Sequence, residues 1–187
     1  MYDKMKQIEN TNSSHKNNTI AGSFLPAIIC FVIMVIIDQA TKYWIDHNMV
    51  LYDSIPVIKN VFEIHYIRNP GAAWGIFADK QVLFYICTIF VLIFGVWFYI
   101  RCAKSGIFHD IQILIVLILS GAVGNFIDRL RFQYVIDFFY FKLIDFPVFN
   151  VADCYVTVGF FFLIILLLFK YNEEDFERLR HGGKNAL

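Results

Sequence analysis

Residues 150–169 read NVADCYVTVGFFFLIILLLF. After Asp153 this stretch carries no charged side chain. Its apolar part, residues 151–169, is close to the about 20 residues that an α-helix needs to cross the hydrocarbon core of a bilayer. The stretch therefore predicts a transmembrane helix with an acid in its first turn.

Three further apolar runs precede this one, at residues 20–40, 82–100 and 111–127. The chain of 187 residues is 58% hydrophobic, whereas soluble domains are usually about 45–50% apolar. We therefore predict an all-α membrane protein in which four transmembrane helices form one domain over residues 20–170. Polar tails are expected at 1–19 and 171–187. An even number of spans places both tails on the same side of the membrane.

The distribution of Lys and Arg indicates which side that is. The two tails, counted together with Lys170, and the 101–109 turn hold nine of these residues, and the other two connections hold seven. Cytoplasmic segments carry the excess of basic residues, so we expect both termini in the cytoplasm. The 1–19 tail is polar, which predicts disorder. The apolar run after it lacks the small-residue site of a removable signal peptide, so it should remain as an anchor.

The two connections on the other side are more than simple turns. Residues 61–66, VFEIHY, alternate between apolar and polar side chains in the manner of a half-buried strand. Residues 129–149 contain eight aromatic side chains, as is typical of a segment at the lipid–water interface. These patterns predict a small sheet and loop subdomain on the extracytoplasmic membrane surface.

Ionisable side chains near membrane depth are costly, and five acids lie close to the predicted helix ends. Asp38 and Lys42 are four residues apart, so they share one helix face, and an interfacial ion pair is the simpler interpretation of them. The five acids are Asp38, Asp128, Asp137, Asp145 and Asp153.

One face of the third predicted span combines packing and polar features. Gly121, Asn125 and Asp128 follow a spacing that puts them on the same side of a helix. Ser120 and Gly124 form a pair of small residues suited to close helix contact. Structural packing and a polar site are therefore both compatible with this face.

The two remaining acids differ in how easily they are explained. Asn150 and Asp153 fit an N-cap and the third helical position of the last span, a favourable helix start in any protein. Asp137 lies inside the apolar run VIDFF, where no capping role is evident, and burial there would raise its pKa. If the chain brings the two together, a charged and a protonated carboxyl could hydrolyse a peptide bond, with Asp153 as base and Asp137 as acid.

Other catalytic chemistries find no support in the sequence. There is no H-E-x-x-H, G-x-S-x-G or P-loop motif. The five histidines are scattered, and the four cysteines have no C-x-x-C spacing and are interpreted as buried small hydrophobic residues. The net charge of zero indicates no nucleic-acid partner. We therefore expect no metal and no cofactor.

Five motifs together resemble those of the lipoprotein signal peptidases, the signal peptidase II family of bacterial membrane aspartic proteases. The similarity covers about residues 24–169, and the order of the motifs matches as well. They are Asp38–Lys42 (DQATK), Asn69–Trp74 (NPGAAW), Gly124–Arg129 (GNFIDR), Val135–Phe138 (VIDF) and Phe149–Asp153 (FNVAD). Trp74 replaces a common Phe, and Cys154 stands where Ser or Thr often follows the acid.

This resemblance implies an aspartic endopeptidase whose catalytic dyad is Asp137 and Asp153. It implies a multi-pass protein of the bacterial cytoplasmic membrane, with its active site near the outer face. The substrate would be a prolipoprotein that carries diacylglyceryl on a cysteine and is cleaved just before it, and we expect the enzyme to be a monomer among membrane lipids. Residues that would bind substrate or support the site are Asp38, Lys42, Asn69, Gly71, Asn125, Asp128, Arg129, Asn150 and Ala152.

Two alternatives remain open at this point. An intramembrane aspartyl protease of the presenilin or prepilin-peptidase type would carry a G-x-G-D or similar motif, which the sequence lacks. A small transporter or assembly factor that uses intramembrane acids as an ion relay would explain Asp38, Lys42 and Asp128. It would not explain the acids at 137 and 153.

Overall fold

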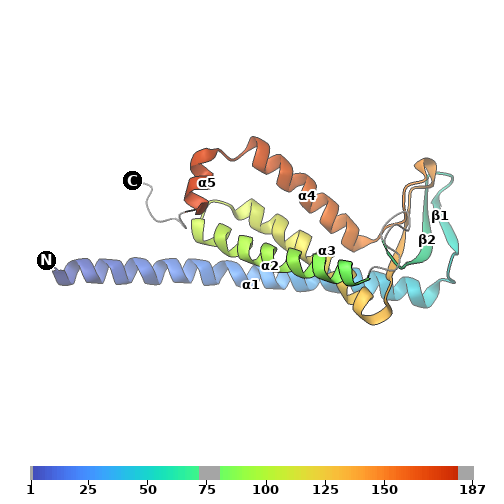
Figure 1. Ribbon diagram of the computed structural model, residues 1–187, viewed down its shortest axis with the longest axis horizontal. Coiled ribbons are helices and arrows are strands. Elements are labelled where there is room, and N and C mark those ends of the chain that lie inside the picture. Colours follow the sequence, from blue (N-terminus) through green and yellow to red (C-terminus); the bar gives the residue numbers. More distant parts are fainter. Residues whose placement is uncertain (1, 72–80, 181–187) are drawn as a thin grey trace.

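The computed structural model describes residues 2–71 and 81–180, with only the backbone described for 2–21, 23 and 178. Long helices run side by side, and a small sheet lies at one end of them (Figure 1). The helices are α1 (Tyr2–Asn48), α2 (Gln81–Ser105), α3 (His109–Phe132), α4 (Val151–Phe169) and the short α5 (Glu173–Arg180). The strands are β1 (Ser54–Ile58), β2 (Phe62–Asn69) and β3 (Val135–Tyr140), and a 3-10 turn, η2, spans Lys142–Ile144.

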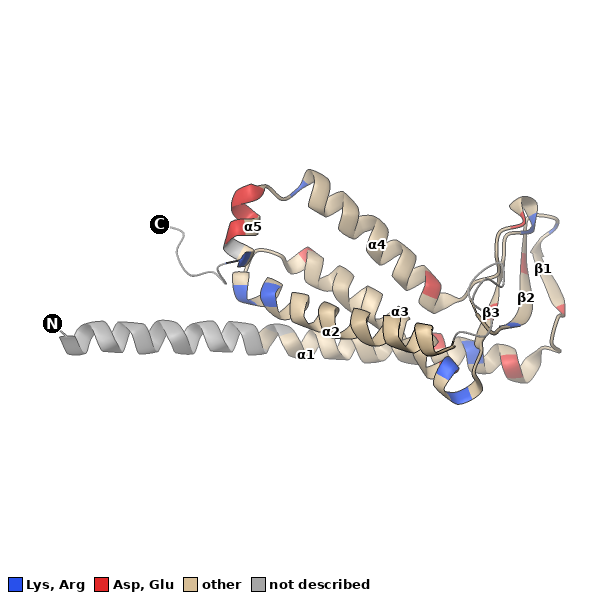
Figure 2. Cartoon of the chain, viewed as in Figure 1, with Lys and Arg blue, Asp and Glu red and all other residues tan. Residues whose placement is uncertain are grey.

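Four of these helices are long and apolar enough to cross a membrane: Phe24–Asn48 of α1, α2, α3 and α4. The predicted four-span architecture is confirmed, although the first three helices extend beyond the apolar runs. Large apolar side chains point outward from α2, as expected where lipid rather than water surrounds a helix. They include Val82, Ile86, Phe90, Ile93 and Trp97. Charged side chains are concentrated near the helix ends and on the sheet (Figure 2).

The N-terminal tail differs from expectation. Helix α1 begins at Tyr2, so the backbone of the polar tail is helical where the sequence predicts disorder. Adding residues to an existing helix is much easier than starting one, and the tail extends the helix of the first span.

Cys30 and Cys87 are exposed on the outside of the helices, so the prediction that all the cysteines are buried is wrong. A small side chain on such a face contacts lipid instead of protein.

The sheet joins two connections that are far apart in the sequence. Its order is β1-β2-β3 with antiparallel pairing, and Ile67 of β2 is opposite Asp137 of β3. The strand predicted at 61–66 is confirmed from Phe62 onward, and β2 continues to Asn69, whereas the sequence does not predict β3 as a strand. Residues 135–138 of β3 are all buried, so the strand has no alternation of polar and apolar side chains that could have revealed it.

Two apolar clusters hold the fold together. One lies between the helices at the end nearer α5 and is centred on Tyr99, Phe108 and Ile115. The other joins the last turns of α1 to the sheet through Ile45, Met49, Tyr66, Ile136 and Phe138. The second cluster fixes β3 against the end of the helices, and this places Asp137 next to the start of α4.

Glycine on α3 permits close contact with α4. A methyl group added at Gly121 would stand 2.3 Å from the carbonyl oxygen of Ala152, which belongs to the backbone and cannot rotate away. We expect Gly121→Ala to push the helices apart and to lower the free energy of unfolding by about 1–3 kcal/mol. Gly22→Ala is the matched control, since its methyl group would meet no described atom within 4 Å. Unfolding in detergent micelles measures both, and equal stabilities would contradict this packing.

Candidate active site

Asp137 is buried on β3, with 2% of its surface exposed. Both of its carboxylate oxygens accept hydrogen bonds from amide side chains. Asn69 Nδ2, at the end of β2, donates to Oδ2 at 2.8 Å, and Asn150 Nδ2 donates to Oδ1 at 2.6 Å. Asp137, for which the sequence offers no capping role, is therefore held between the side-chain amides of Asn69 and Asn150.

Asp153 lies in the first turn of α4 and forms a capping box with Asn150. Asn150 Oδ1 accepts from the backbone N–H of Asp153 at 3.0 Å, and Asp153 Oδ2 accepts from the backbone N–H of Asn150 at 3.1 Å. Its second oxygen, Oδ1, accepts from Asn125 Nδ2 at 2.8 Å. The predicted helix cap is confirmed. One carboxylate oxygen serves the cap, while the other faces α3.

Asn150 connects the two acids. Its side chain donates to Asp137 and its backbone N–H donates to Asp153. The same Nδ2 also donates to Asn125 Oδ1 at 3.0 Å, and Asn150 itself is fully buried. Two carboxyl groups that are 16 positions apart in the sequence are thus fixed around one residue, at the sheet end of the helices.

Behind this pair lies a buried ion cluster. Lys42 Nζ is 3.0 Å from Asp38 Oδ2 and 3.0 Å from Asp128 Oδ2, and all three side chains are no more than 2% exposed. The predicted Asp38–Lys42 ion pair therefore exists, and it is buried together with Asp128 rather than standing alone. Lys42 also donates to Asn125 Oδ1 at 2.8 Å, so the cluster orients the amide that binds Asp153.

The other predicted site residues contact residues that bind the two acids or that belong to the ion cluster. Ala152 donates its backbone N–H to Asp38 Oδ1 at 2.9 Å, and Gly71 donates its own to Asn69 Oδ1 at 3.1 Å. Arg129 Nη1 lies 3.4 Å from the carbonyl oxygen of Asn125, and its guanidinium carbon is 4.5 Å from the ring centre of Phe84.

One candidate acid is separate from the site, and one site residue was missed. Asp145 is exposed and accepts a hydrogen bond from Tyr140. Gln39 was not predicted, but its Nε2 donates to Asp128 Oδ1 at 3.0 Å and to the carbonyl oxygen of Gly124 at 3.1 Å. Its position directly after Asp38 in the first motif was the available signal. Trp74 and the rest of 72–80 lie outside the described residues.

The two acids differ electrostatically. Burial, and next the nearby charge of Asp153, raise the pKa of Asp137 to about 7, although the hydrogen bonds from Asn69 and Asn150 act in the opposite direction. Asp153, in the first turn of α4, accepts hydrogen bonds on both of its oxygens. The arrangement can therefore hold one proton between two carboxyl groups near neutral pH. Among the described residues no group of three His, Cys, Asp or Glu side chains could hold a metal ion.

Comparison with known proteins gives consistent matches over most of the chain. The family described as signal peptidase (SPase) II matches residues 30–169. A lipoprotein signal peptidase of Clostridioides difficile strain 630 is 41% identical over 142 residues, which cover 76% of this chain and 94% of that protein. A lipoprotein signal peptidase of Streptococcus pyogenes serotype M1 is 37% identical over 149 residues, which cover 80% and 95%.

Solved structures of bacterial membrane enzymes share this architecture. One matches with a TM-score of 0.70 and 43% identity, covering 76% of this chain and 87% of the other. A second matches with a TM-score of 0.69 and 41% identity, covering 78% and 94%. The overall fold is thus shared with these enzymes over most of both chains.

Proposed function

The chain belongs to the signal peptidase II family, and we propose that it removes signal peptides from prolipoproteins with Asp137 and Asp153 as the reacting acids. The observation that carries the proposed mechanism is the bridge through Asn150, which binds both carboxyl groups at once. An ion relay, the alternative function, would leave this bridge and the family match without explanation.

In the proposed reaction, ionised Asp153 takes a proton from a water molecule, and the oxygen of that water attacks the scissile carbonyl carbon. Protonated Asp137 donates a hydrogen bond to the carbonyl oxygen as negative charge develops there. The C–N bond then breaks, and its nitrogen receives a proton from the pair. The products are an amine on the mature chain and a carboxylic acid on the signal peptide, which releases its proton to solvent, so the two acids return to sharing one proton.

The surroundings of the pair support this division of roles. Asp137 is buried, with 2% of its surface exposed, and this burial favours its neutral form. Asp153 receives hydrogen bonds on both oxygens, from the backbone of Asn150 and the amide of Asn125, and these fix the direction in which its carboxyl group points. Lys42, which belongs to the buried cluster with Asp38 and Asp128, donates a hydrogen bond to Asn125 Oδ1. This bond keeps the Asn125 amide in the same orientation during the reaction.

We infer that the substrate carries diacylglyceryl on the cysteine that follows the cleaved bond. A lipid-bearing substrate reaches the site through the bilayer, and the pair lies where the spanning helices meet the sheet. The start of α1 and α5 lie at the other end (Figure 1). With the excess of Lys and Arg in the tails, this arrangement supports cytoplasmic termini and an extracytoplasmic site.

The substrate and the type of chemistry can be tested with purified protein in micelles. We expect cleavage of a prolipoprotein peptide with diacylglyceryl on its cysteine, with mass spectrometry showing that the new N-terminus is the lipid-bearing cysteine. The same peptide without lipid is the matched control and should be cut far less. Chelators should leave the rate unchanged, since two carboxyl groups need no metal for this step. Loss of activity that a divalent ion restores would contradict the mechanism.

The proposed proton sharing predicts the pH dependence of cleavage. The pKa of Asp137 is raised to about 7, so its carboxyl keeps the proton below that pH and loses it above. We therefore expect kcat/KM to fall as pH rises through about 7, approaching tenfold per pH unit on the alkaline side for loss of one essential proton. The profile is measured with stability monitored at each pH. A rate that stays constant between pH 6 and 9 would refute the role of Asp137 as the acid.

A further inference from the structure

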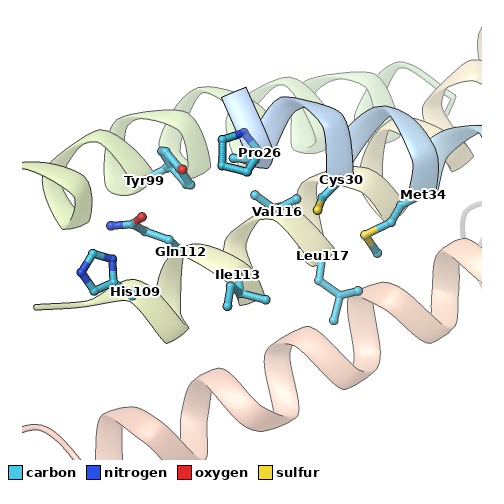
Figure 3. A pocket seen from close by; sticks show the side chains of 10 residues that line it. Pro26, Cys30, Met34, Tyr99, His109, Gln112, Ile113, Val116 and Leu117 are labelled. Atoms are coloured by element: carbon cyan, nitrogen blue, oxygen red, sulfur yellow. The ribbon is translucent and has the colours of Figure 1, made fainter. Parts of the chain in front are cut away.

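A second hollow lies between α1, α2 and α3, far from the two acids and toward the α5 end of the helices (Figure 3). Its volume is about 390 Å³, within the range of pockets that bind small molecules. Nearly all of its lining is apolar, and two lining residues, Cys30 and Ile113, are exposed on the outside of the helices. Since both belong to membrane-spanning segments, the hollow opens toward lipid.

One polar group that lines this hollow, the side-chain amide of Gln112, has an N–H group without a partner in the described part of the chain. Gln112 is 5% exposed, and its Nε2 is buried with no acceptor among the described residues. Figure 3 shows the amide end of Gln112 between the side chains of Tyr99 and His109, which line the same hollow. A buried donor without an acceptor costs about 1–3 kcal/mol. A ligand that supplies an acceptor oxygen at this point would remove that cost.

The depth of the donor indicates the kind of ligand. Gln112 lies in the first turn of α3, which begins at His109, so its amide is close to the boundary between hydrocarbon and headgroups. From there the apolar lining continues to Leu117 on α3 and to Met34 on α1, toward the middle of the membrane. A fitting ligand therefore has an acceptor near the membrane boundary and an apolar chain that points inward.

We propose that this hollow binds one acyl chain of a membrane glycerophospholipid, whose ester carbonyl oxygen accepts a hydrogen bond from Gln112 Nε2. The ester group joins the headgroup region to the acyl chain, so it has the acceptor and the apolar tail in the order that the hollow presents them. Water alone would not fill this volume, because apolar cavities remain dry. The site is distinct from the carboxyl pair, which lies at the sheet end of the same helices.

Photo-crosslinking in nanodiscs tests this lipid site. The probe is phosphatidylglycerol with a diazirine in one acyl chain, and mass spectrometry locates the cross-links. In the wild type, we expect them to be enriched on Cys30, Met34, Ile113 and Leu117 relative to the outward face of α2 at Phe90 and Ile93. Gln112→Met keeps the length of the side chain but removes its donor. It should lower the enrichment about fivefold, as expected from losing one hydrogen bond.

A second variant separates binding from folding. Cys30→Phe fills the opening from an exposed position, so the protein core is unchanged, and it should abolish the enrichment while prolipoprotein cleavage continues. Cross-links at Phe90 and Ile93 should be the same in all three proteins. Excess unlabelled phosphatidylglycerol should displace the probe from the hollow, and free fatty acid should not. Equal labelling of the hollow and the α2 face, unchanged labelling in both variants, or displacement by fatty acid alone would overturn the proposal.

Discussion

Asp137→Asn and Asp153→Asn are each expected to lower kcat/KM for prolipoprotein cleavage by about 10²–10⁴-fold, the range over which general acid–base groups contribute. Asn at 137 cannot supply the proton for the scissile bond, and Asn at 153 cannot accept one from water. Both replacements keep the shape of the side chain. Asp153→Asn also keeps an oxygen that can accept from the backbone N–H of Asn150 in the capping box.

The control for both variants is Asp145→Asn. Asp145 lies on the same side of the protein but is exposed and hydrogen-bonded to Tyr140 rather than to the site. The backbone at Asp145 is in the left-handed region, with φ of 47°, and Asn tolerates this conformation. The cleavage activity of the Asp145→Asn variant should therefore remain close to that of the wild type. The double variant at 137 and 153 should lose little more than either single one, because groups that act as a unit are not additive. Substantial cleavage by a folded single variant would eliminate the proposed pair.

Lys42→Met is expected to destabilise the protein by about 3–5 kcal/mol, because it leaves two buried carboxylates without their cation. Lys42 contacts Asp38 and Asp128 at 3.0 Å each, and none of the three is more than 2% exposed. The lost lysine also removes the hydrogen bond to Asn125, so any variant that still folds should cleave more slowly. The free energy of unfolding in micelles is the measurement.

Lys170→Met is the matched control, since Lys170 forms an ion pair with Asp110 in which its side chain is 57% exposed. An exposed pair contributes about 0–1 kcal/mol, so the same chemical change should have a small effect there. Adding Asp38→Asn and Asp128→Asn to Lys42→Met should restore part of the stability, because the uncompensated charges are then removed. If Lys42→Met costs no more than Lys170→Met, the cluster does not stabilise the fold as inferred.

Several features could be predicted from the sequence because they depend on short stretches. The four spans follow from the length of apolar runs, and the cap at Asn150 and Asp153 follows from a spacing of three residues. The pairing of Asp38 with Lys42 follows from one turn of a helix. The order of five motifs indicated the family, which the match over residues 30–169 confirms.

The approach of Asp137 to Asp153 was a hypothesis that no short stretch could decide. It depends on β3 pairing with β2 and on Asn150, which places hydrogen-bond donors on both acids. The strand itself gave no periodic signal, since its first four residues are all buried. The motif pattern pointed to both acids, but it did not reveal the residue that joins them.

By itself, the sequence determined the membrane-spanning helices, the cap at the start of the last helix and the family, because hydrophobic length, capping residues and motifs can be read from the chain without its fold. Only the tertiary structure decided that the Asp38–Lys42 pair is buried with Asp128, that Gln39 belongs to the site, and that Asn150 binds both Asp137 and Asp153. These features depend on how closely the helices approach. Gly121 and Gly124, which have no side chain to separate α3 from Ala152 and Asp38, allow that close approach.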